Sequence, residues 1–325
     1  MTQEQQFTPL IIPIASGKGG VGKSMVTAGL ARALATSGRR TIAVDLDLGG
    51  SNLHAYFGIA NDNPGIGDYI ETKGSHLADY AVPLDDDLYF IPGDGVRPFL
   101  ANIHHGQKIR LLREITRLPA EIVLLDLGAG SSFNTLDFFR VFPHGLIVSG
   151  TGYTAIMNMM NFLKNVALRV VSKGIGQNTF MQEIVDRAAR QTMADQMIAI
   201  PEIIDQLAAI NPKRAQLLRS ELAALRPLLM VNMLRDLDDL TFVEPVIASL
   251  HKRLGIEVDW IGTLLDEEGG RWHWPSLHAP HGELPKLTGV NRIAARLDGS
   301  AAIPMPEELH DEARRLWQFV HGGGK

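Results

Sequence analysis

A glycine-rich stretch near the start of the chain constrains the fold more than any other feature. The segment SGKGGVGKS follows the apolar run LIIPIA and precedes the helical pattern MVTAGLARALATSG. Its residues Gly17, Gly22, Lys23 and Ser24 satisfy the pattern G-x-x-x-x-G-K-[ST] in the strand–loop–helix setting that the pattern requires. Glycines allow backbone N–H groups to converge on phosphate oxygens, and the helix N-terminus adds positive potential. The stretch therefore predicts a phosphate-binding loop, and a glycine-rich turn without a ligand is the disfavoured alternative.

The same pattern assigns roles to side chains of the loop. Lys23 would reach the β- and γ-phosphates of a nucleotide, and the Ser24 hydroxyl would bind Mg²⁺. The other residues expected to bind the nucleotide here are Gly17, Lys18, Gly19, Gly20, Val21, Gly22 and Met25. The pattern does not require Lys18, which cannot easily reach the phosphates of its own loop from the second position without displacing the backbone. Lys18 therefore needs a different target.

Short β-branched runs alternate with amphipathic helical segments along the chain. This alternation is typical of an α/β fold with a mostly parallel sheet and helices on both faces. The expected strands are Leu10–Ala15, Thr41–Asp45, Leu88–Ile91, Ile122–Leu127, Leu146–Ser149, Leu228–Leu234 and Trp260–Leu264. Because ligands bind at the carboxyl ends of such strands, the polar residues that follow them are expected to form one site. Pro13 lacks an N–H group and predicts a bulge or a late start in the first strand.

The pattern becomes helical between Val171 and Arg226, where prolines begin successive segments. We expect a helical insertion at about 171–226 within a single domain that spans 1–325. Two interpretations of the insertion stay open: an element that docks a partner or forms a dimer, and a helix pair that covers the sheet.

A last helix is expected at about 306–320, with one apolar face made by Leu309, Ala313, Leu316, Trp317 and Val320. Trp317 beside two arginines would suit a membrane surface. The acidic residues in the first half of the helix would be repelled by anionic lipid, so packing against the sheet is favoured.

Composition narrows the classes of function. The chain has 325 residues with 31 basic and 36 acidic side chains, so its formal charge of −5 gives no global reason to expect nucleic acid. It has no cysteine, which excludes disulfides, thiolate metal sites and a cysteine nucleophile. We see neither a basic leader followed by an apolar run nor an apolar stretch of about 18 residues, and expect a cytoplasmic protein.

Several segments together resemble one family. KGGVGKS, Lys18–Ser24, resembles the deviant Walker A motif of the MinD/ParA ATPases. VDLDLGGSNLHAYFG, Val44–Gly58, and DLGAG, Asp126–Gly130, resemble the switch I and switch II segments of the family. VNMLR, Val231–Arg235, and IGTLLD, Ile261–Asp266, are similar to its late strands. Among the subfamilies, the resemblance is closest to MinD-like and FlhG-like members, the latter concerned with flagellar number and site.

The resemblance implies a P-loop NTPase fold that uses ATP and Mg²⁺ and that pairs two copies around ATP. Lys18 would then reach across the homodimer to the nucleotide of the other subunit and act in catalysis. Asp47 would orient or deprotonate the attacking water and lie at the metal, and Asp126 would hold Mg²⁺ through water. Asp45 and Gly128 would belong to the switch segments.

The same resemblance implies where the base lies. Asn232 would hydrogen-bond adenine, while the backbone at the end of the last strand would close over the base, at Leu264, Leu265 and Asp266.

The leading hypothesis is a molecular switch with slow, partner-stimulated ATP hydrolysis. It would position a flagellum, pilus, division site, chromosome locus or secretion machine through a recruited or regulatory protein, with a membrane surface or cell pole as a further location. The alternatives are an ATPase with a metabolic or maturation role and a DNA-binding partition ATPase. A scaffold that binds ATP without turnover is disfavoured because Lys18, Lys23, Ser24, Asp47 and Asp126 are all present. DNA is the less favoured partner, although the insertion carries Lys213, Arg214, Arg219 and Arg226.

Overall fold

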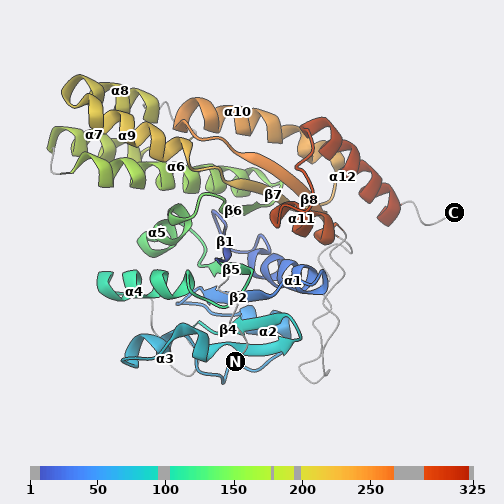
Figure 1. Cartoon of the computed structure of the whole chain (residues 1–325). Helices are drawn as coiled ribbons and strands as arrows, with labels where there is room; N and C mark the ends of the chain where they lie inside the picture. The colour runs from blue at the N-terminus through green and yellow to red at the C-terminus, as the bar shows by residue number, and fades with distance from the viewer. Residues whose placement is uncertain (1–7, 94–102, 177–178, 194–198, 267–288, 322–325) are drawn as a thin grey trace. The chain divides into compact units, whose positions relative to one another are not determined.

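A computed structural model describes residues 8–93, 103–176, 179–193, 199–266 and 289–321 of the chain (Figure 1). The chain divides into two compact units. The first contains Met1–Ile14, Gly22–Gly128 and Glu267–Ala302, and the second contains Ala15–Val21, Ala129–Asp266 and Ile303–Lys325. The expectation of a single domain stays a prediction.

The first unit is built around strands in the order β3-β4-β2-β5-β1. These strands are β1 (Leu10–Ala15), β2 (Thr41–Leu46), β3 (Val82–Asp85), β4 (Leu88–Ile91) and β5 (Ile122–Leu127). The pairs β2–β4, β2–β5 and β1–β5 are parallel, whereas β3 and β4 are antiparallel. Only a short turn joins β3 to β4, and a parallel connection would need a longer crossover. The predicted strands are present, with β3 added.

The strand β1 runs through Pro13, so the predicted bulge or late start is wrong. Pro13 pairs with Leu125 in unbroken register along β5. The N–H of Leu10 donates to the carbonyl of Glu121 at 2.8 Å. Successive backbone nitrogens of a strand point to opposite sides, so the nitrogen of Pro13, three residues later, faces away from β5. The missing donor therefore costs no bond in this pair of strands.

The helices of the first unit are α1 (Lys23–Thr36), α2 (Leu53–Phe57), α3 (Ile66–Glu71), α4 (His105–Ile115) and α11 (Val290–Leu297), with the 3₁₀ helix η1 (Leu77–Tyr80). Small residues let α1 pack closely, and it contacts α2, α11, β2 and β5. Phe57 of α2 meets Phe90 of β4 with ring centroids 5.3 Å apart in the core. These contacts pack α1 and α2 against each other and against neighbouring strands of the first unit.

The second unit contains the parallel strands β6 (Leu146–Ser149), β7 (Leu228–Leu234) and β8 (Asp259–Leu265), in that order. Its other elements include α5 (Phe133–Val141), η2 (Leu237–Phe242), α10 (Val243–Leu254) and α12 (Pro306–His321). Helix α12 contacts β8 and buries Leu309, Ala313 and Leu316. This is the packing against strands that the apolar face of the last helix predicts; the side chain of Val320 lies outside the described residues.

A cluster of four helices accounts for the helical stretch: α6 (Tyr153–Ile175), α7 (Thr179–Arg190), α8 (Ile200–Ile210) and α9 (Pro212–Ala223) (Figure 1). The helices contact one another, and proline occupies the first turn of both α8 and α9. Lys164 on α6 is buried and donates to the Ala189 carbonyl at 3.1 Å, so its ammonium caps the C-terminus of α7. Among the described residues, no helix is both long enough and apolar enough to cross a bilayer.

Candidate functional site

The loop between β1 and α1 has a conformation that glycine permits. Gly20 and Gly22 have φ angles of +82° and +81°, in the left-handed region that disfavours a Cβ atom. Gly22 is the N-cap of α1 and gives the helix no side-chain cap. The N–H groups of the first turn are thereby left to bind an anion, as the predicted phosphate-binding loop requires.

Gly17 lies where this loop passes against helix α6. A Cβ atom on Gly17 would lie 2.1 Å from the backbone carbonyl carbon of Asn158. The loop is braced at the same point, because Ser16 Oγ donates to the Lys18 carbonyl at 3.0 Å and the Gly130 N–H donates to the Ser16 carbonyl at 3.1 Å. Position 17 therefore requires glycine for packing as well as for the sequence pattern.

Replacing Gly17 with alanine is expected to lower the free energy of unfolding by about 1–3 kcal/mol, because the backbone of α6 would have to move. Urea unfolding measures the change. Gly19→Ala is the matched control, since a Cβ there meets nothing within 4 Å and should change stability by less than about 0.5 kcal/mol. Equal losses in the two variants would contradict the close approach.

Lys23 and Asp126 form a buried ion pair at the start of α1. Lys23 Nζ lies 2.8 Å from Asp126 Oδ1, and the side chains are 7% and 1% exposed. Lys23 Nζ is also 3.4 Å from Ser24 Oγ. The hydroxyl of Thr27 lies 2.9 Å from the same Asp126 oxygen and 3.0 Å from the Lys23 carbonyl oxygen, so its one hydrogen is shared between these two acceptors. The structure thus brings together Lys23, Ser24 and Asp126, which the sequence proposes for phosphate and metal binding.

The second carboxylate oxygen of Asp126 indicates a ligand. Asp126 Oδ2 is buried and has no hydrogen-bond partner among the described residues. Leaving a buried carboxylate oxygen unsatisfied is costly, so such an atom calls for a cation, a water or a donor. A hydroxyl and a carboxylate are hard oxygen ligands of the kind that Mg²⁺ prefers. Ser24 and Asp126 therefore fit a Mg²⁺ site, and the water-mediated role of Asp126 stays a prediction.

Asp45 organises the segment that follows β2. Its carboxylate accepts from the Asp47 N–H at 3.0 Å, the Ser51 hydroxyl at 2.6 Å and the Leu53 N–H at 3.1 Å. Strand pairing places Asp45 opposite Asp126. Burial, followed by the negative charge of Asp126, raises the pKa of Asp45 to about 7. These contacts suit the predicted supporting role of Asp45, since they tie the strand end to the start of α2.

Asp47 is half-buried in the turn after β2, and its carbonyl accepts from the Gly50 N–H at 3.0 Å. Through its backbone N–H it is linked to Asp45, which faces Asp126 across the strand pair. Gly128 directly follows β5. The catalytic role of Asp47 and the switch role of Gly128 stay predictions.

The residues expected around the base lie at the carboxyl ends of β7 and β8. Asn232 is 1% exposed, and its Nδ2 donates to the Val21 carbonyl at 2.9 Å. Asp266 Oδ2 accepts from Arg235 Nε at 2.6 Å, so the ends of the two strands are also joined. The last expected residues are all buried at the end of β8: Leu264, Leu265 and Asp266. Asn232 is thus connected directly to the phosphate-binding loop, and its contact with adenine stays a prediction.

The predicted residues are divided between the two compact units. The first unit holds Gly22, Lys23, Ser24, Met25, Asp45, Asp47, Asp126 and Gly128, and the second holds Gly17, Lys18, Gly19, Gly20, Val21, Asn232, Leu264, Leu265 and Asp266. Lys18 is half-buried, and its reach into a second subunit stays a prediction.

Sequence reasoning misses two side chains that hold the site together, Thr27 and Ser51. Thr27 follows Lys23 by four residues, one helical turn, so helix periodicity alone places it on the same face. Ser51 lies six residues after Asp45, and no short-range pattern links the two.

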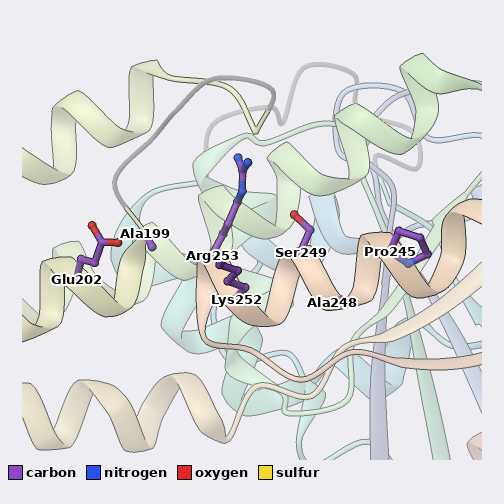
Figure 2. Close-up of a pocket in the computed structure, with 7 residues that line it drawn as sticks. All are labelled: Ala199, Glu202, Pro245, Ala248, Ser249, Lys252 and Arg253. Carbon is purple, nitrogen blue, oxygen red and sulfur yellow. The ribbon is translucent and has the colours of Figure 1, made fainter.

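A separate pocket of about 550 Å³ lies between α8 and α10 (Figure 2). Its lining residues are Ala199, Glu202, Pro245, Ala248, Ser249, Lys252 and Arg253. None of the predicted site residues is among them. Arg253 also donates to the Met193 carbonyl at 2.7 Å, so this cation is engaged within the protein.

The segment RWHWPSLHAPHG contains three histidines, and the sequence favours a proline-braced aromatic loop near the nucleotide there over a metal site, because no carboxylate or cysteine stands at ligand spacing. His273, His278 and His281 lie outside the described residues. Within the described part of the chain, no group of three or more His, Cys, Asp or Glu side chains could hold a metal ion. The donor set at Ser24 and Asp126 is different in kind, because nucleotide phosphates would supply part of the coordination.

The strand–loop–helix arrangement and the Lys23–Asp126 pair define an α/β nucleotide-binding protein. Residues 12–273 match the CobQ/CobB/MinD/ParA nucleotide binding domain, CbiA. The chain belongs to this family, as the resemblance in its motifs predicts.

Individual relatives match shorter stretches. The septum site-determining protein MinD of Helicobacter pylori is 33% identical over 125 residues, which cover 37% of this chain and 45% of that protein. The antiactivator FleN of Pseudomonas aeruginosa is 28% identical over 157 residues, which cover 47% of this chain and 55% of that protein. An iron-sulfur cluster carrier protein of Saccharolobus solfataricus is 26% identical over 184 residues, which cover 51% of this chain and 57% of that protein. The chain spans about half the length of these curated relatives.

Solved structures match over most of the chain. The MinD cell division protein of Aquifex aeolicus has a TM-score of 0.51 at 20% identity, covering 91% of this chain and 98% of that one. MinD of Pyrococcus horikoshii, complexed with Mg-ADP, has a TM-score of 0.52 at 16% identity, covering 91% of this chain and 98% of that one. The ParA family ATPase of Chlorobium tepidum has a TM-score of 0.52 at 14% identity, covering 89% of this chain and 98% of that one. These likenesses confirm the predicted P-loop NTPase fold.

Proposed function

We propose that this protein is an ATP-binding and ATP-hydrolysing switch that forms an ATP-dependent homodimer and positions a cellular structure by recruiting a partner. The observation that carries the proposal is the buried Lys23–Asp126 pair, in which Asp126 Oδ2 has no partner among the described residues. When a nucleotide binds, its phosphate could replace Asp126 as the partner of Lys23. A hydrated cation could then replace Lys23 as the partner of Asp126.

The chemistry that these residues support is phosphoryl transfer from ATP to water. Such transfer depends mainly on positioning and on charge stabilisation. Mg²⁺, held by Ser24 and through water by Asp126, would neutralise negative charge on the β- and γ-phosphates. Lys23 and the first turn of α1 would bind the phosphates, and Asp47 would orient the attacking water and accept its proton.

The dimer accounts for the second lysine of the loop. Lys18 has no role in the phosphate-binding pattern of its own chain, and a cation supplied across a subunit interface can stabilise charge in the transition state of phosphoryl transfer. The positioning role is supported by a relative whose name describes septum site determination, and a regulatory role by one whose name describes antiactivation. A cytoplasmic location, with peripheral binding at a membrane or pole, belongs to the same proposal.

The alternatives receive less support. An iron–sulfur carrier would use thiolates, and these 325 residues contain no cysteine. For DNA binding, three of the four basic residues considered are engaged within the protein. Arg214 donates to the Gly174 carbonyl, Arg219 pairs with Asp205, and Arg226 pairs with Asp259. A metabolic or maturation ATPase would share the loop chemistry and differ in its second substrate.

Replacing Ser24 with alanine is expected to lower the apparent affinity for Mg²⁺ in ATP hydrolysis at least about tenfold, because a ligand oxygen is lost. Phosphate release from ATP, titrated with MgCl₂, measures the effect and tests the proposed activity. Ser37→Ala at the other end of α1 removes a hydroxyl that donates to the Leu34 carbonyl, and it should leave the titration unchanged. Hydrolysis that persists in EDTA, or that Ser24→Ala does not affect, would contradict the proposed metal site.

A further inference from the structure

Three cationic side chains of α5 and α6 surround one carboxylate in the second unit. The carboxylate belongs to Asp137 of α5, whose side chain is 7% exposed. Its Oδ1 lies 3.2 Å from Nε of both Arg140 and Arg169, and 3.0 Å from Lys173 Nζ. Its Oδ2 accepts a further hydrogen bond from Arg169 Nη2 at 3.2 Å. A single cation would neutralise Asp137, so the cluster carries an excess of two positive charges.

The sequence concentrates positive charge on these two helices, which pack against each other (Figure 1). Asp137 is the one acidic residue in the sequence of either helix, whereas α6 adds Lys164 to the cations of the cluster. Lys164 is buried at the end of α7, so the exposed charge comes from the cluster. The whole chain has a formal charge of −5, and a local excess of the opposite sign favours contact with an anionic group.

The arginines of the cluster keep hydrogen-bond donors that Asp137 does not use. Arg140 donates through Nε alone, and Arg169 through Nε and Nη2. A guanidinium has five N–H donors, and neither arginine has another acceptor among the described residues. Both side chains are partly exposed, at 22% and 26%. Asp137 therefore holds two planar donor groups in place, and such groups match the geometry of carboxylates.

Apolar side chains flank the cluster along α5. Phe133 is 70% exposed, and the guanidinium of Arg169 lies over its ring, 4.7 Å from the centroid. Val141 is 44% exposed at the other end of the helix. Phe133 and Val141 lie four residues before and four residues after Asp137, so all three share one face of α5. The exposed surface therefore combines cations with an aromatic ring and an aliphatic side chain.

We propose that this α5–α6 surface, formed by Phe133, Arg140, Val141, Arg169 and Lys173, docks an acidic segment of a partner protein. The segment would carry at least two carboxylates to match the excess charge, with apolar side chains beside them to cover the ring and the valine. This inference rests on the proposed function in one respect, because the segment would belong to the partner that the switch recruits.

A protein segment suits the surface better than a nucleic acid or a membrane. Duplex DNA presents phosphates over a long footprint, but two further arginines of this unit, Arg219 and Arg226, are paired with aspartates. Exposed aromatic rings next to arginine are typical of protein interfaces, whereas the phosphate backbone of a duplex offers a phenyl ring no contact. A membrane would require a wider apolar face than Phe133 and Val141 provide.

The test measures the affinity of the full chain for a fluorescein-labelled peptide in which single leucines alternate with pairs of glutamates. Fluorescence anisotropy at low ionic strength, without nucleotide, gives the dissociation constant. Arg169→Gln should weaken binding at least about tenfold, because it removes a charged fork and the group that holds the ring. Phe133→Ala should weaken it about fivefold, as truncation of an aromatic interface residue does.

The matched controls are an exposed cation and an exposed ring elsewhere in the same unit, Lys252→Gln on α10 and Phe180→Ala on α7. Both should bind the peptide as the natural protein does. Thermal unfolding checks that each variant is folded. If Arg169→Gln does not fold, Lys173→Gln replaces it, because that substitution leaves both arginines on Asp137 and should still weaken binding several-fold.

The inference is overturned if the natural protein does not bind the peptide, or if the surface variants bind it as tightly as the controls. It is also overturned if duplex DNA, or vesicles of phosphatidylcholine and phosphatidylglycerol, bind more tightly than the peptide and lose affinity in Arg169→Gln. ATP hydrolysis separates this result from the proposed function. Normal hydrolysis without peptide binding refutes the surface alone, and peptide binding by a chain that does not hydrolyse ATP refutes the proposed activity alone.

Discussion

Replacing Lys23 with methionine is expected to lower the free energy of unfolding by about 3–5 kcal/mol in the absence of nucleotide. The Asp126 carboxylate is 1% exposed, so the substitution would leave it in the interior without its cation. Thr27 would still donate to it, but a hydroxyl does not neutralise a charge. Urea unfolding measures the loss, and the same variant should lose measurable Mg-ADP binding because its phosphate-binding cation is gone.

The control is the double variant Lys23→Met with Asp126→Asn. It removes the charge that the single variant leaves unpaired, while the asparagine oxygen can still accept from Thr27. Breaking a buried pair costs more than replacing both partners, so the double variant should recover most of the lost stability. A double variant as unstable as Lys23→Met alone would show that the ion pair is not the source of the loss.

Replacing Lys18 with alanine is expected to lower ATP turnover about 100-fold, while Mg-ADP affinity changes by less than about twofold. A cation supplied across a subunit interface contributes mainly in the transition state of phosphoryl transfer, where such groups are worth roughly 10³–10⁵ in rate. Lys18 is not required for phosphate binding within its own chain, so ADP should still bind. Steady-state phosphate release and ADP calorimetry measure the two quantities.

Lys73→Ala serves as the matched control, because Lys73 is an exposed lysine outside the loop. It should change neither turnover nor ADP affinity. An equal loss of ADP affinity and turnover in Lys18→Ala would mean that Lys18 binds the nucleotide of its own subunit, which contradicts the cross-subunit role.

Much of the fold could be predicted because its signals are local. Buried parallel strands appear as continuous apolar runs, and the helix after the loop begins where the glycine pattern ends. The strand β3 was not predictable in this way, since VPLD is short, contains Pro83 and has no buried residue, with half-buried and exposed residues alternating along it. Pro13 shows the opposite failure. A local rule predicts disruption, but alternation along the strand turns the proline nitrogen away from β5.

The site was predictable in its residues and less so in its contacts. The carboxyl-end rule brings Lys23 and Asp126 to one place, although they are 103 positions apart in the chain. Sequence cannot show that one oxygen of Asp126 is paired and the other is unsatisfied, because that depends on packing. Met233 in β7 has a φ angle of +59°, and this left-handed conformation has no local signal either, because the residue lies in a run whose pattern favours an ordinary strand.

The central claim is that ATP, and not ADP, joins two copies of this chain. The most direct test is light scattering behind size exclusion on the Asp47→Ala variant, which should bind ATP and hydrolyse it too slowly to leave the ATP state. We expect a mass near twice the 35.6 kDa of the chain with Mg-ATP and a single-chain mass with Mg-ADP. A mass that is the same with both nucleotides would contradict it.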